Sequence, residues 1–359
     1  MKNSFPGYYQ PTETELRRLW DNSIVVLESN VLLNLYRYSA ETNAEIIQNL
    51  EQLSDRLWIP YNEAKQYHEK RIEVIEGQEE SYIDLQKFLN EVQDDLKDRL
   101  LSDNHSFLAD QLIDKVIKIF SDIRTKLGDN KEEYLSLFEN DELKATISEL
   151  LSRKVGARYT DEQLEEIYKK GVGRTKKGMP PGIIPNEKFD AKKYHDLIVW
   201  MQIMDKAKAT YKPILMLTDK TTTNWWLTFK DKKIGPRPEL VEEMRNSANV
   251  EFYMYRIDPF MKNSQKYLNF EVKPAAIEEI QKFRLRDEKR INTRDMLAHK
   301  LRNQRETVLE LSQELEDMAN KTELFSLLDV SNAINKYKSA NKPEEPTIKK
   351  SEVNKISEE

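Results

Sequence analysis

Charged and polar side chains directly follow two of the most apolar runs in the sequence. Glu28 comes after residues 23–27 (SIVVL), and residues 218–220 (TDK) come after residues 213–217 (PILML). Continuous apolar runs of this length are typical of buried parallel strands. In sheets of parallel strands, functional residues lie at the carboxyl ends of the strands. These positions are therefore the first candidates for a functional site.

Several common catalytic chemistries lack the side chains that they need. The sequence has no cysteine, which excludes disulfides, thiolate zinc sites and cysteine nucleophiles. Its four histidines are too scattered to suggest a histidine metal cluster. There is no P-loop, no dinucleotide-binding glycine pattern and no Gly-x-Ser-x-Gly motif. Nucleotide hydrolysis and esterase chemistry therefore have no support in the sequence.

A basic segment rich in glycine and proline lies in the middle of the chain. Residues 171–185 (GVGRTKKGMPPGIIP) contain four of the nine glycines and three of the thirteen prolines, so we predict a loop. Positive charge is concentrated in and just before it, at Lys169, Lys170, Arg174, Lys176 and Lys177. Contact with nucleic-acid phosphates is one interpretation. An ordinary solvated loop is the other.

Composition limits the range of functions further. The formal net charge of −6 gives no general attraction to nucleic acid, so any such binding needs a local patch. No apolar run approaches the roughly 20 residues of a membrane span, and the N-terminus has no apolar signal-peptide region. We therefore expect a soluble protein without membrane contact, most simply a cytoplasmic one.

The elements that must position the candidate residues alternate between strand and helix. Besides the two runs above, residues 57–60 (LWIP) and 250–255 (VEFYMY) are predicted strands. This order predicts an α/β fold with a mainly parallel sheet flanked by helices. Helical periodicity over about residues 72–170 predicts a long helical insertion, most simply a cap on the sheet. Within it, Thr160 followed by Gln163 predicts a capping box.

The C-terminal part of the chain has a different pattern. Apolar residues step by four and three from Leu297 to Met318, with one polar position, which makes a heptad seam of about three heptads. Self-association as a coiled coil and folding back on the chain's own domain are both compatible with it. From Ser339 onward few apolar residues occur, which predicts a disordered tail. We therefore expect a domain over residues 1–265, a helical extension over 275–338 and a tail over 339–359.

Four segments resemble successive motifs of the PIN-like domain family, a nuclease fold. In chain order they are VVLESNVLLNLYRYS, LWIPYNEAKQYHEKRIEVI, KKYHDLIVWMQIM and ILMLTDKTTTNWWL, with a PPG turn at residues 180–182 before the third. The resemblance covers about residues 20–260. For active members it implies a cluster of four or five acidic side chains at a metal. Mg²⁺ and Mn²⁺ prefer such hard oxygen ligands, and the metal activates a water toward the scissile phosphate.

Several positions depart from the family pattern. The positions that correspond to the catalytic set of the family are Glu28, Asn30, Gln66, Asp196, Lys220 and Asn224. Asn30 and Asp196 keep the family residue, and Glu28 replaces an aspartate but keeps its charge. Gln66 and Asn224 replace acids by amides, and Lys220 replaces the aspartate of the Thr-x-Asp motif. The four core positions therefore carry a formal charge of −1, where the family pattern gives −4.

The lysine decides which hypothesis leads. A divalent cation next to an ammonium group is repelled by about 2 kcal/mol per unit charge even with strong screening. We predict that Lys220 takes the place of the metal and pairs with Glu28 and Asp196. The leading hypothesis is a PIN-like pseudo-nuclease that needs no cofactor and binds RNA or a protein partner.

Two alternatives stay open. An active endoribonuclease dependent on Mg²⁺ or Mn²⁺ would use Glu28 and Asp196 as metal ligands, with Glu63 or Asp219 as a relocated acid. An interaction subunit would act through its C-terminal helices, either on a protein partner or on a second copy through residues 297–318. The pair Trp225 and Trp226 could stack on bases, but core packing is the simpler interpretation of two tryptophans after a strand.

Overall fold

The structure, a computed structural model, describes residues 1–2, 4–102, 106–181, 191–220, 224–230, 232–289 and 336. The chain divides into two compact units, Met1–Leu285 and Arg286–Glu359, and the elements below belong to the first. This unit extends beyond residue 265, because residues 274–285 are helical and bury Ile277 and Ile280 in its core. The predicted heptad seam and the predicted tail lie outside the described residues.

A parallel sheet of four strands lies at the centre of this unit. Its strands are β1 (Ile24–Leu27), β2 (Leu57–Trp58), β3 (Ile214–Leu217) and β6 (Phe252–Tyr255), in the spatial order β2-β1-β3-β6. All residues of β1 and β3 are buried, as their continuous apolar runs predict. The predicted α/β fold with a mainly parallel sheet is confirmed.

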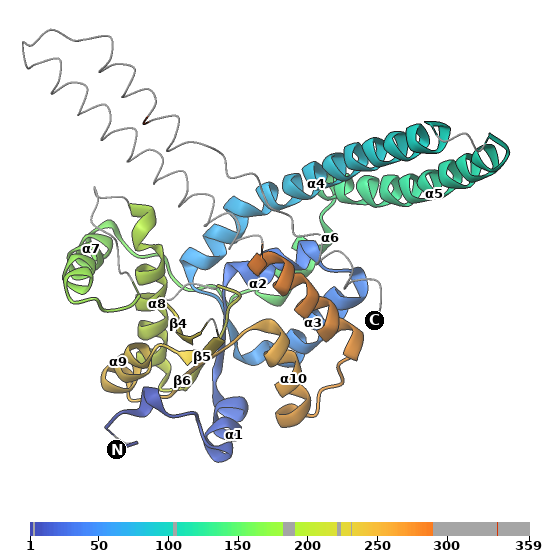
Figure 1. Ribbon diagram of the computed structural model, residues 1–359. Coiled ribbons are helices and arrows are strands. Elements are labelled where there is room, and N and C mark those ends of the chain that lie inside the picture. Colours follow the sequence, from blue (N-terminus) through green and yellow to red (C-terminus); the bar gives the residue numbers. More distant parts are fainter. Residues whose placement is uncertain are drawn as a thin grey trace, which may run out of the picture. The chain divides into compact units, whose positions relative to one another are not determined.

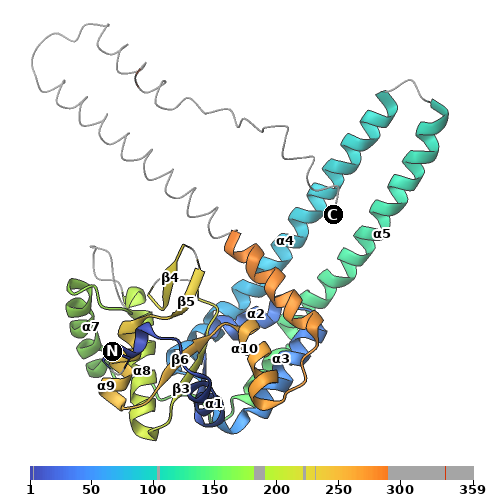
Figure 2. The same ribbon diagram turned by 60° about the horizontal axis from the view of Figure 1, so that its bottom comes forward.

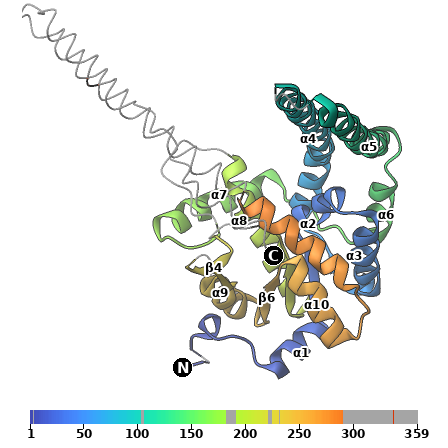
Figure 3. The ribbon, with the colours of Figure 1, turned by 45° about the vertical axis from the view of Figure 1, so that its right-hand side comes forward.

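Helices cover both faces of the sheet (Figures 1 and 3). On one face pack α1 (Glu13–Asn22), α2 (Ser29–Asn34), α3 (Ala40–Gln52) and α10 (Ile257–Leu268). On the other face pack α8 (His195–Thr210) and α9 (Pro238–Ala248). Successive strand residues point to opposite faces, so Val25 and Leu27 enter the first core while Val26 and Met216 enter the second.

The predicted helical insertion begins earlier than expected, and only part of it packs on the sheet domain, through Ile75, Ile147 and Leu150 among others. Helix α4 (Tyr61–Ser102) starts directly after β2 and pairs with α5 (Ser106–Glu139) in a hairpin. Beyond the buried Ile75, the hairpin extends away from the sheet (Figure 2). Two shorter helices follow, α6 (Glu142–Leu150) and α7 (Asp161–Lys176). The predicted capping box of Thr160 and Gln163 is present at the start of α7.

Helix α7 corrects the first part of the predicted loop over residues 171–185. Residues 171–176 are helical, residues 177–181 form turns and bends as predicted, and residues 182–190 lie outside the described residues. Gly171 permits a close approach of α7 to α8, because a Cβ atom there would lie 2.3 Å from Cε1 of Tyr194. The glycine thus serves helix packing rather than a turn.

A small antiparallel sheet was not predicted. It consists of β4 (Trp226–Phe229) and β5 (Lys232–Pro236), which come after β3 and Lys220 in the sequence. Its lysines and exposed phenylalanine hide the alternation that identifies a strand. In the part of the chain that the structure describes, no helix is long and apolar enough to cross a membrane.

Candidate functional site

A buried cluster of ion pairs lies at the carboxyl edge of the parallel sheet, centred on the ammonium group of Lys220. Its Nζ atom lies 2.8 Å from Oδ1 of Asp196 and 3.1 Å from Oε1 of Glu28. A third carboxylate oxygen, Oε1 of Glu63, lies 3.3 Å away. Both glutamates are fully buried, and the lysine side chain is 12% exposed. One ammonium group therefore faces three carboxylates.

The register of the sheet brings these residues together. Ile24–Leu27 align with Ile214–Leu217 without offset, so β1 and β3 end at the same level. Glu28 and Thr218, the next residues of the two strands, are hydrogen-bonded through the threonine hydroxyl. The same hydroxyl accepts the backbone N–H of Lys220 at 3.1 Å, which turns the chain toward the cluster. Glu28 and Lys220 thus come from strand ends, and Glu63 and Asp196 come from the first turns of α4 and α8.

The acid on α4 is Glu63, not a residue at the position of Gln66. The two positions are one helical turn apart and lie on the same side of α4. Oε2 of Glu63 accepts the backbone N–H of Ser29 at 2.9 Å. Gln66 instead accepts a hydrogen bond from the Ser29 hydroxyl at 2.6 Å. Lys220 thus lies next to Glu28 and Asp196, as predicted, and Glu63, named above as a possible relocated acid, joins them and brings the formal charge of the cluster to −2.

Asp219 and Asn30 have different roles from the acids. Asp219 points away from Lys220, since its carboxylate accepts hydrogen bonds from Asn34 Nδ2 at 2.9 Å and from the backbone N–H of residue 257 at 3.4 Å. It is not a relocated ligand in this arrangement. Asn30 donates to Oε1 of Glu28 at 3.0 Å and orients that carboxylate.

The two tryptophans after β3 are part of the core. Trp225 is fully buried against Trp200, and the Lys220 ammonium lies 5.8 Å from its ring centroid. Nε1 of Trp226 donates to the backbone carbonyl of Lys220 at 2.8 Å. The rings hold the lysine in place and are not accessible for stacking on bases. Asn224 lies half-buried in the turn just before them.

Burial and charge shift the pKa values of the cluster in different directions. Burial raises the pKa of Glu28 to about 7, against the opposing effect of Lys220. Burial also acts to raise the pKa of Glu63, but Lys220 and His195 outweigh it and lower that pKa below its ordinary value. For Lys220 the carboxylates outweigh burial and raise its pKa well above 10.5. The cluster thus holds a charged lysine, an ionised Glu63 and a Glu28 that titrates near neutral pH.

The chemistry of the nuclease fold would place a divalent cation among such carboxylates. Here the point that the three carboxylates share is taken by Nζ of Lys220. A divalent ion about 4 Å from an ammonium group is repelled by on the order of 8 kcal/mol at an effective dielectric constant of 20. The described residues also contain no group of three or more acidic and histidine side chains arranged to hold a metal. With Lys220 in this position, the residues do not fit a divalent cation.

Arg174 does not belong with the basic residues that could contact phosphate. It is buried, and its guanidinium donates to both carboxylate oxygens of Glu243, at 2.6 and 2.8 Å, and to the carbonyls of Pro180 and Pro181. These contacts tie α7 to α9. The four lysines of the predicted set, in contrast, are exposed. They are Lys169, Lys170, Lys176 and Lys177.

A cleft of about 820 Å³ lies beside the cluster, between the start of α4 and the pair α7 and α8. It reaches the cluster at Gln66 and His195. Three tyrosines and three basic side chains contribute to its walls: Tyr61, Tyr159, Tyr168, Lys65, Lys70 and Arg158. Glu69 and Glu73 also line it, so the formal charge of its ionised side chains is close to +1.

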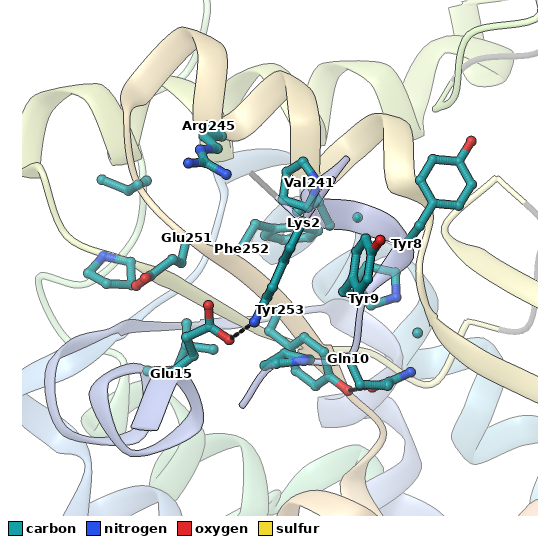
Figure 4. A pocket seen from close by; sticks show the side chains of 18 of the residues that line it. Lys2, Tyr8, Tyr9, Gln10, Glu15, Val241, Arg245, Glu251, Phe252 and Tyr253 are labelled. Atoms are coloured by element: carbon teal, nitrogen blue, oxygen red, sulfur yellow. Dashed lines mark hydrogen bonds and ion pairs between the residues drawn. The ribbon is translucent and has the colours of Figure 1, made fainter. Parts of the chain in front are cut away.

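A second pocket, of about 500 Å³, lies at the opposite, amino edge of the sheet (Figure 4). The N-terminal segment, α1, α9 and the start of β6 form it. Charged side chains on its walls pair with one another, as in Lys2 with Glu15 at 2.7 Å and Arg18 with Glu251. It shares no lining residue with the Lys220 cluster and is separate from the candidate site.

Two residues of the site, Ser29 and His195, were not singled out in the sequence. The backbone N–H of Ser29 donates to Glu63, and Nε2 of His195 lies 3.1 Å from Oε1 of Glu63. Each is a direct sequence neighbour of a predicted site residue. That adjacency is the signal that could have found them.

Comparison with known protein families agrees with this geometry. Residues 24–240 match the model of a family described as a PIN like domain. Searches of curated proteins and of solved structures gave no match. The matched segment covers more than half of the chain. It contains β1, β2 and β3 of the parallel sheet and the cluster residues Glu28, Glu63, Asp196 and Lys220. The chain belongs to the PIN-like domain family.

Proposed function

We propose that this protein is a PIN-like domain that does not cleave nucleic acid and that binds single-stranded RNA in the cleft beside its Lys220 cluster. The observation that carries the first half is the position of Nζ of Lys220, within 3.3 Å of three carboxylates. An ammonium group offsets part of the negative charge of these acids, but it cannot coordinate and activate a water as a metal ion does. The cluster holds the ends of β1 and β3 to the starts of α4 and α8.

The second half rests on the composition of the cleft walls. Exposed faces of tyrosine rings stack on bases of any sequence, and basic side chains contact the phosphates between them. Two of the rings are held by the fold: Tyr159 donates its hydroxyl to Asp205 at 2.6 Å, and Tyr168 packs against Tyr194. Rings fixed in advance lose little conformational entropy on binding. Because the chain as a whole is acidic, such a local patch is what RNA binding requires.

Anisotropy of a labelled single-stranded RNA of 20 nucleotides tests the binding half. Each lost phosphate contact should reduce the slope of log K against log salt by about 0.7. Replacing Lys65, Lys70 and Arg158 by glutamine should therefore flatten the slope by about 2. A second variant, with glutamine at Lys169, Lys170, Lys176 and Lys177, tests whether the exposed lysines of α7 add contacts.

A control variant tests whether the loss of positive charge outside the cleft also changes the salt dependence. Lys208 near the end of α8 and Lys212 just after it are exposed, and their replacement by glutamine should leave the slope unchanged. An equal effect of this control would reduce RNA binding to general electrostatics. No RNA binding by the parent protein would overturn the RNA assignment and leave a protein partner as the ligand class.

One observation favours a second candidate function, an active endoribonuclease. Glu63 supplies a third carboxylate beside Glu28 and Asp196, so the acids for a metal site would be present if Lys220 moved away. Incubation of the RNA with Mg²⁺ or Mn²⁺ distinguishes the two functions. Metal-dependent cleavage that Asp196→Ala abolishes supports the endoribonuclease, and intact RNA supports the binding function.

A further inference from the structure

The pocket at the amino edge of the sheet is covered on one side by residues 6–11, which we call the strap. Contacts with other elements hold the strap in place. At Gly7 the chain lies so close to α9 that a Cβ atom would come within 2.4 Å of Cα of Pro238. Gln10 donates a hydrogen bond to the backbone carbonyl of Ile234 at 2.8 Å. The strap is thus fixed to α9 and to β5, and a space of about 500 Å³ stays open beside it.

The inner walls of this pocket are apolar. Buried Leu19 on α1 and buried Phe252 on β6 line it, together with Val241 on α9. Protein interiors are packed so closely that voids larger than a water molecule are few. Pockets that bind small molecules, in contrast, have volumes of roughly 300–1,000 Å³ and mainly apolar walls with a few polar groups. The pocket therefore has the size and the lining of a ligand site.

Large side chains around the pocket are left in water. Four of the lining residues, three tyrosines and an isoleucine, are between 43% and 79% exposed. They are Tyr8, Tyr9, Tyr211 and Ile234. Figure 4 shows Tyr8 and Tyr9 next to each other on the strap. Apolar surface that gathers around a concave site marks a binding site, because a ligand that covers this surface removes it from water.

The charges on the walls of the pocket balance one another. Lys2 pairs with Glu15, and Arg18 pairs with Glu251. Arg245, a third cation on the walls, belongs to the last turn of α9. Both α8 and α9 end at the pocket, and the carboxyl end of a helix carries about −0.5 of an elementary charge. Two such ends offset the charge of Arg245, so the pocket attracts neither anions nor cations strongly.

We propose that this pocket binds an uncharged, flat aromatic molecule. Five of its lining residues are aromatic: Tyr8, Tyr9, Tyr211, Phe252 and Tyr253. Aromatic rings contact one another in offset-stacked and edge-to-face arrangements, which favours a ring system over an aliphatic chain. Burying a charge in a site whose own charges are already paired costs free energy, which favours an uncharged ligand. The pocket shares no lining residue with the RNA cleft, so ligand binding here is independent of RNA binding.

Fluorescence titration of the full chain with two related probes tests the charge of the ligand. N-phenyl-naphthylamine is uncharged, and anilinonaphthalene sulfonate has the same rings with one added sulfonate. We expect saturable binding of the uncharged probe, with a dissociation constant at least tenfold lower than that of the sulfonate. The uncharged probe should also raise the melting temperature. Absence of saturable binding by the uncharged probe, or tighter binding of the sulfonate, would overturn the proposal.

Displacement of the bound probe tests the requirement for aromatic rings. Naphthol and its saturated counterpart, decahydronaphthol, have the same carbon skeleton and the same hydroxyl group. Naphthol should displace the probe at a concentration at least fivefold lower, because only its rings are flat and aromatic. Equal displacement by the two compounds would contradict an aromatic ligand.

Two substitutions test whether the probe binds in the pocket. A Cβ atom at Gly235 on β5 would have only Gln10 near it, at 3.8 Å, so the side chain of Gly235→Ile enters the open space and should weaken binding at least tenfold. Tyr9→Ala removes a ring of the strap at a position that is 43% exposed, so the chain still folds while binding weakens. Phe229→Ala on β4 and Phe88→Ala on α4 are the controls. Both rings are exposed but lie outside the pocket, so both variants should bind the probe as the parent protein does.

Circular dichroism verifies that each variant keeps its secondary structure. Unchanged affinity in both Gly235→Ile and Tyr9→Ala would overturn the proposal, because the probe would then bind elsewhere. An equal loss of affinity in the control variants would do the same, because binding would then reflect exposed aromatic surface in general.

Discussion

Replacement of Lys220 by alanine distinguishes a buried ion-pair cluster from an incidental surface contact. The lysine is 12% exposed and faces two fully buried glutamates. Truncating one partner of a buried ion pair costs about 3–5 kcal/mol, whereas an exposed pair contributes about 0–1 kcal/mol. Since three carboxylates share this ammonium group, we expect the free energy of unfolding to fall by about 3–5 kcal/mol.

Urea unfolding at pH 8, followed by circular dichroism and tryptophan fluorescence, measures this loss. At pH 6 the loss should be smaller, because Glu28, with a pKa of about 7, then takes up a proton and removes one negative charge from the cluster. Lys262→Ala, which truncates an exposed lysine of α10, is the matched control. It should change the free energy of unfolding by less than about 0.5 kcal/mol.

The same variant should respond to divalent cations. Without the ammonium group, Glu28, Glu63 and Asp196 present uncompensated carboxylates of the kind that bind Mn²⁺. A concentration 100 times the dissociation constant stabilises a protein by about 2.7 kcal/mol, and the parent protein should show no such gain. Adding Gln66→Glu and Asn224→Asp to Lys220→Asp restores the acids of the family pattern and should tighten binding. A loss below about 1 kcal/mol in Lys220→Ala, with no response to Mn²⁺, would refute the reasoning.

Three further predictions concern single residues. Glu28→Gln should flatten the pH dependence of the free energy of unfolding between pH 4.5 and 7. The raised pKa of Glu28, about 7, gives the parent protein about 3 kcal/mol of stability below pH 4.5 that is lost as the pH rises through 7. Urea unfolding at several pH values measures this difference. Arg174→Met should lower the melting temperature by several degrees while Lys176→Gln leaves it unchanged, since Arg174 is buried and paired with Glu243; equal melting temperatures would contradict the packing role. Gly171→Ala should destabilise the protein in thermal unfolding, because the added Cβ meets Tyr194. Gly173→Ala, with open space around it, should stabilise the protein by up to about 1 kcal/mol. An effect of the same sign at both positions would contradict the packing of α7 on α8.

The sheet could be predicted because the sequence pattern of its central strands is clear. Residues 24–27 and 214–217 are continuous apolar runs, and each is followed at once by a polar residue that marks the strand end. Parallel strands in register then bring Glu28 and the residues after β3 to one edge. The family resemblance supplied Asp196 and Gln66, which no periodicity would have connected with them.

The sequence offered Glu63 and Asp219 as possible further acids and could not decide between them, for a physical reason. A helix presents residues one turn apart to nearly the same point in space. An acid at Glu63 can therefore replace one at Gln66 with little change in geometry, and a comparison by position counts it as lost. For Asp219 the opposite holds. It is next to Lys220 in the sequence, but its side chain points to the other side of the chain, toward Asn34.

Two predictions from composition failed through tertiary context. The glycines at 171 and 173 suggested a loop, but α7 continues through them, and packing on Tyr194 accounts for the first. The charge of Arg174 suggested phosphate contact, but its guanidinium is used by Glu243 and two proline carbonyls. Neither partner is near these residues in the sequence, so no local pattern could have revealed them.

The most direct test of the central claim is a cleavage assay of the parent protein on a mixed panel of RNA and DNA in Mg²⁺ and in Mn²⁺. The Asp196→Ala variant, purified in parallel, defines the background from contaminating nucleases. With the Lys220 ammonium at the centre of its carboxylates, the parent protein should cleave no faster than this variant in either metal. Metal-dependent cleavage by the parent protein that Asp196→Ala abolishes would contradict the account.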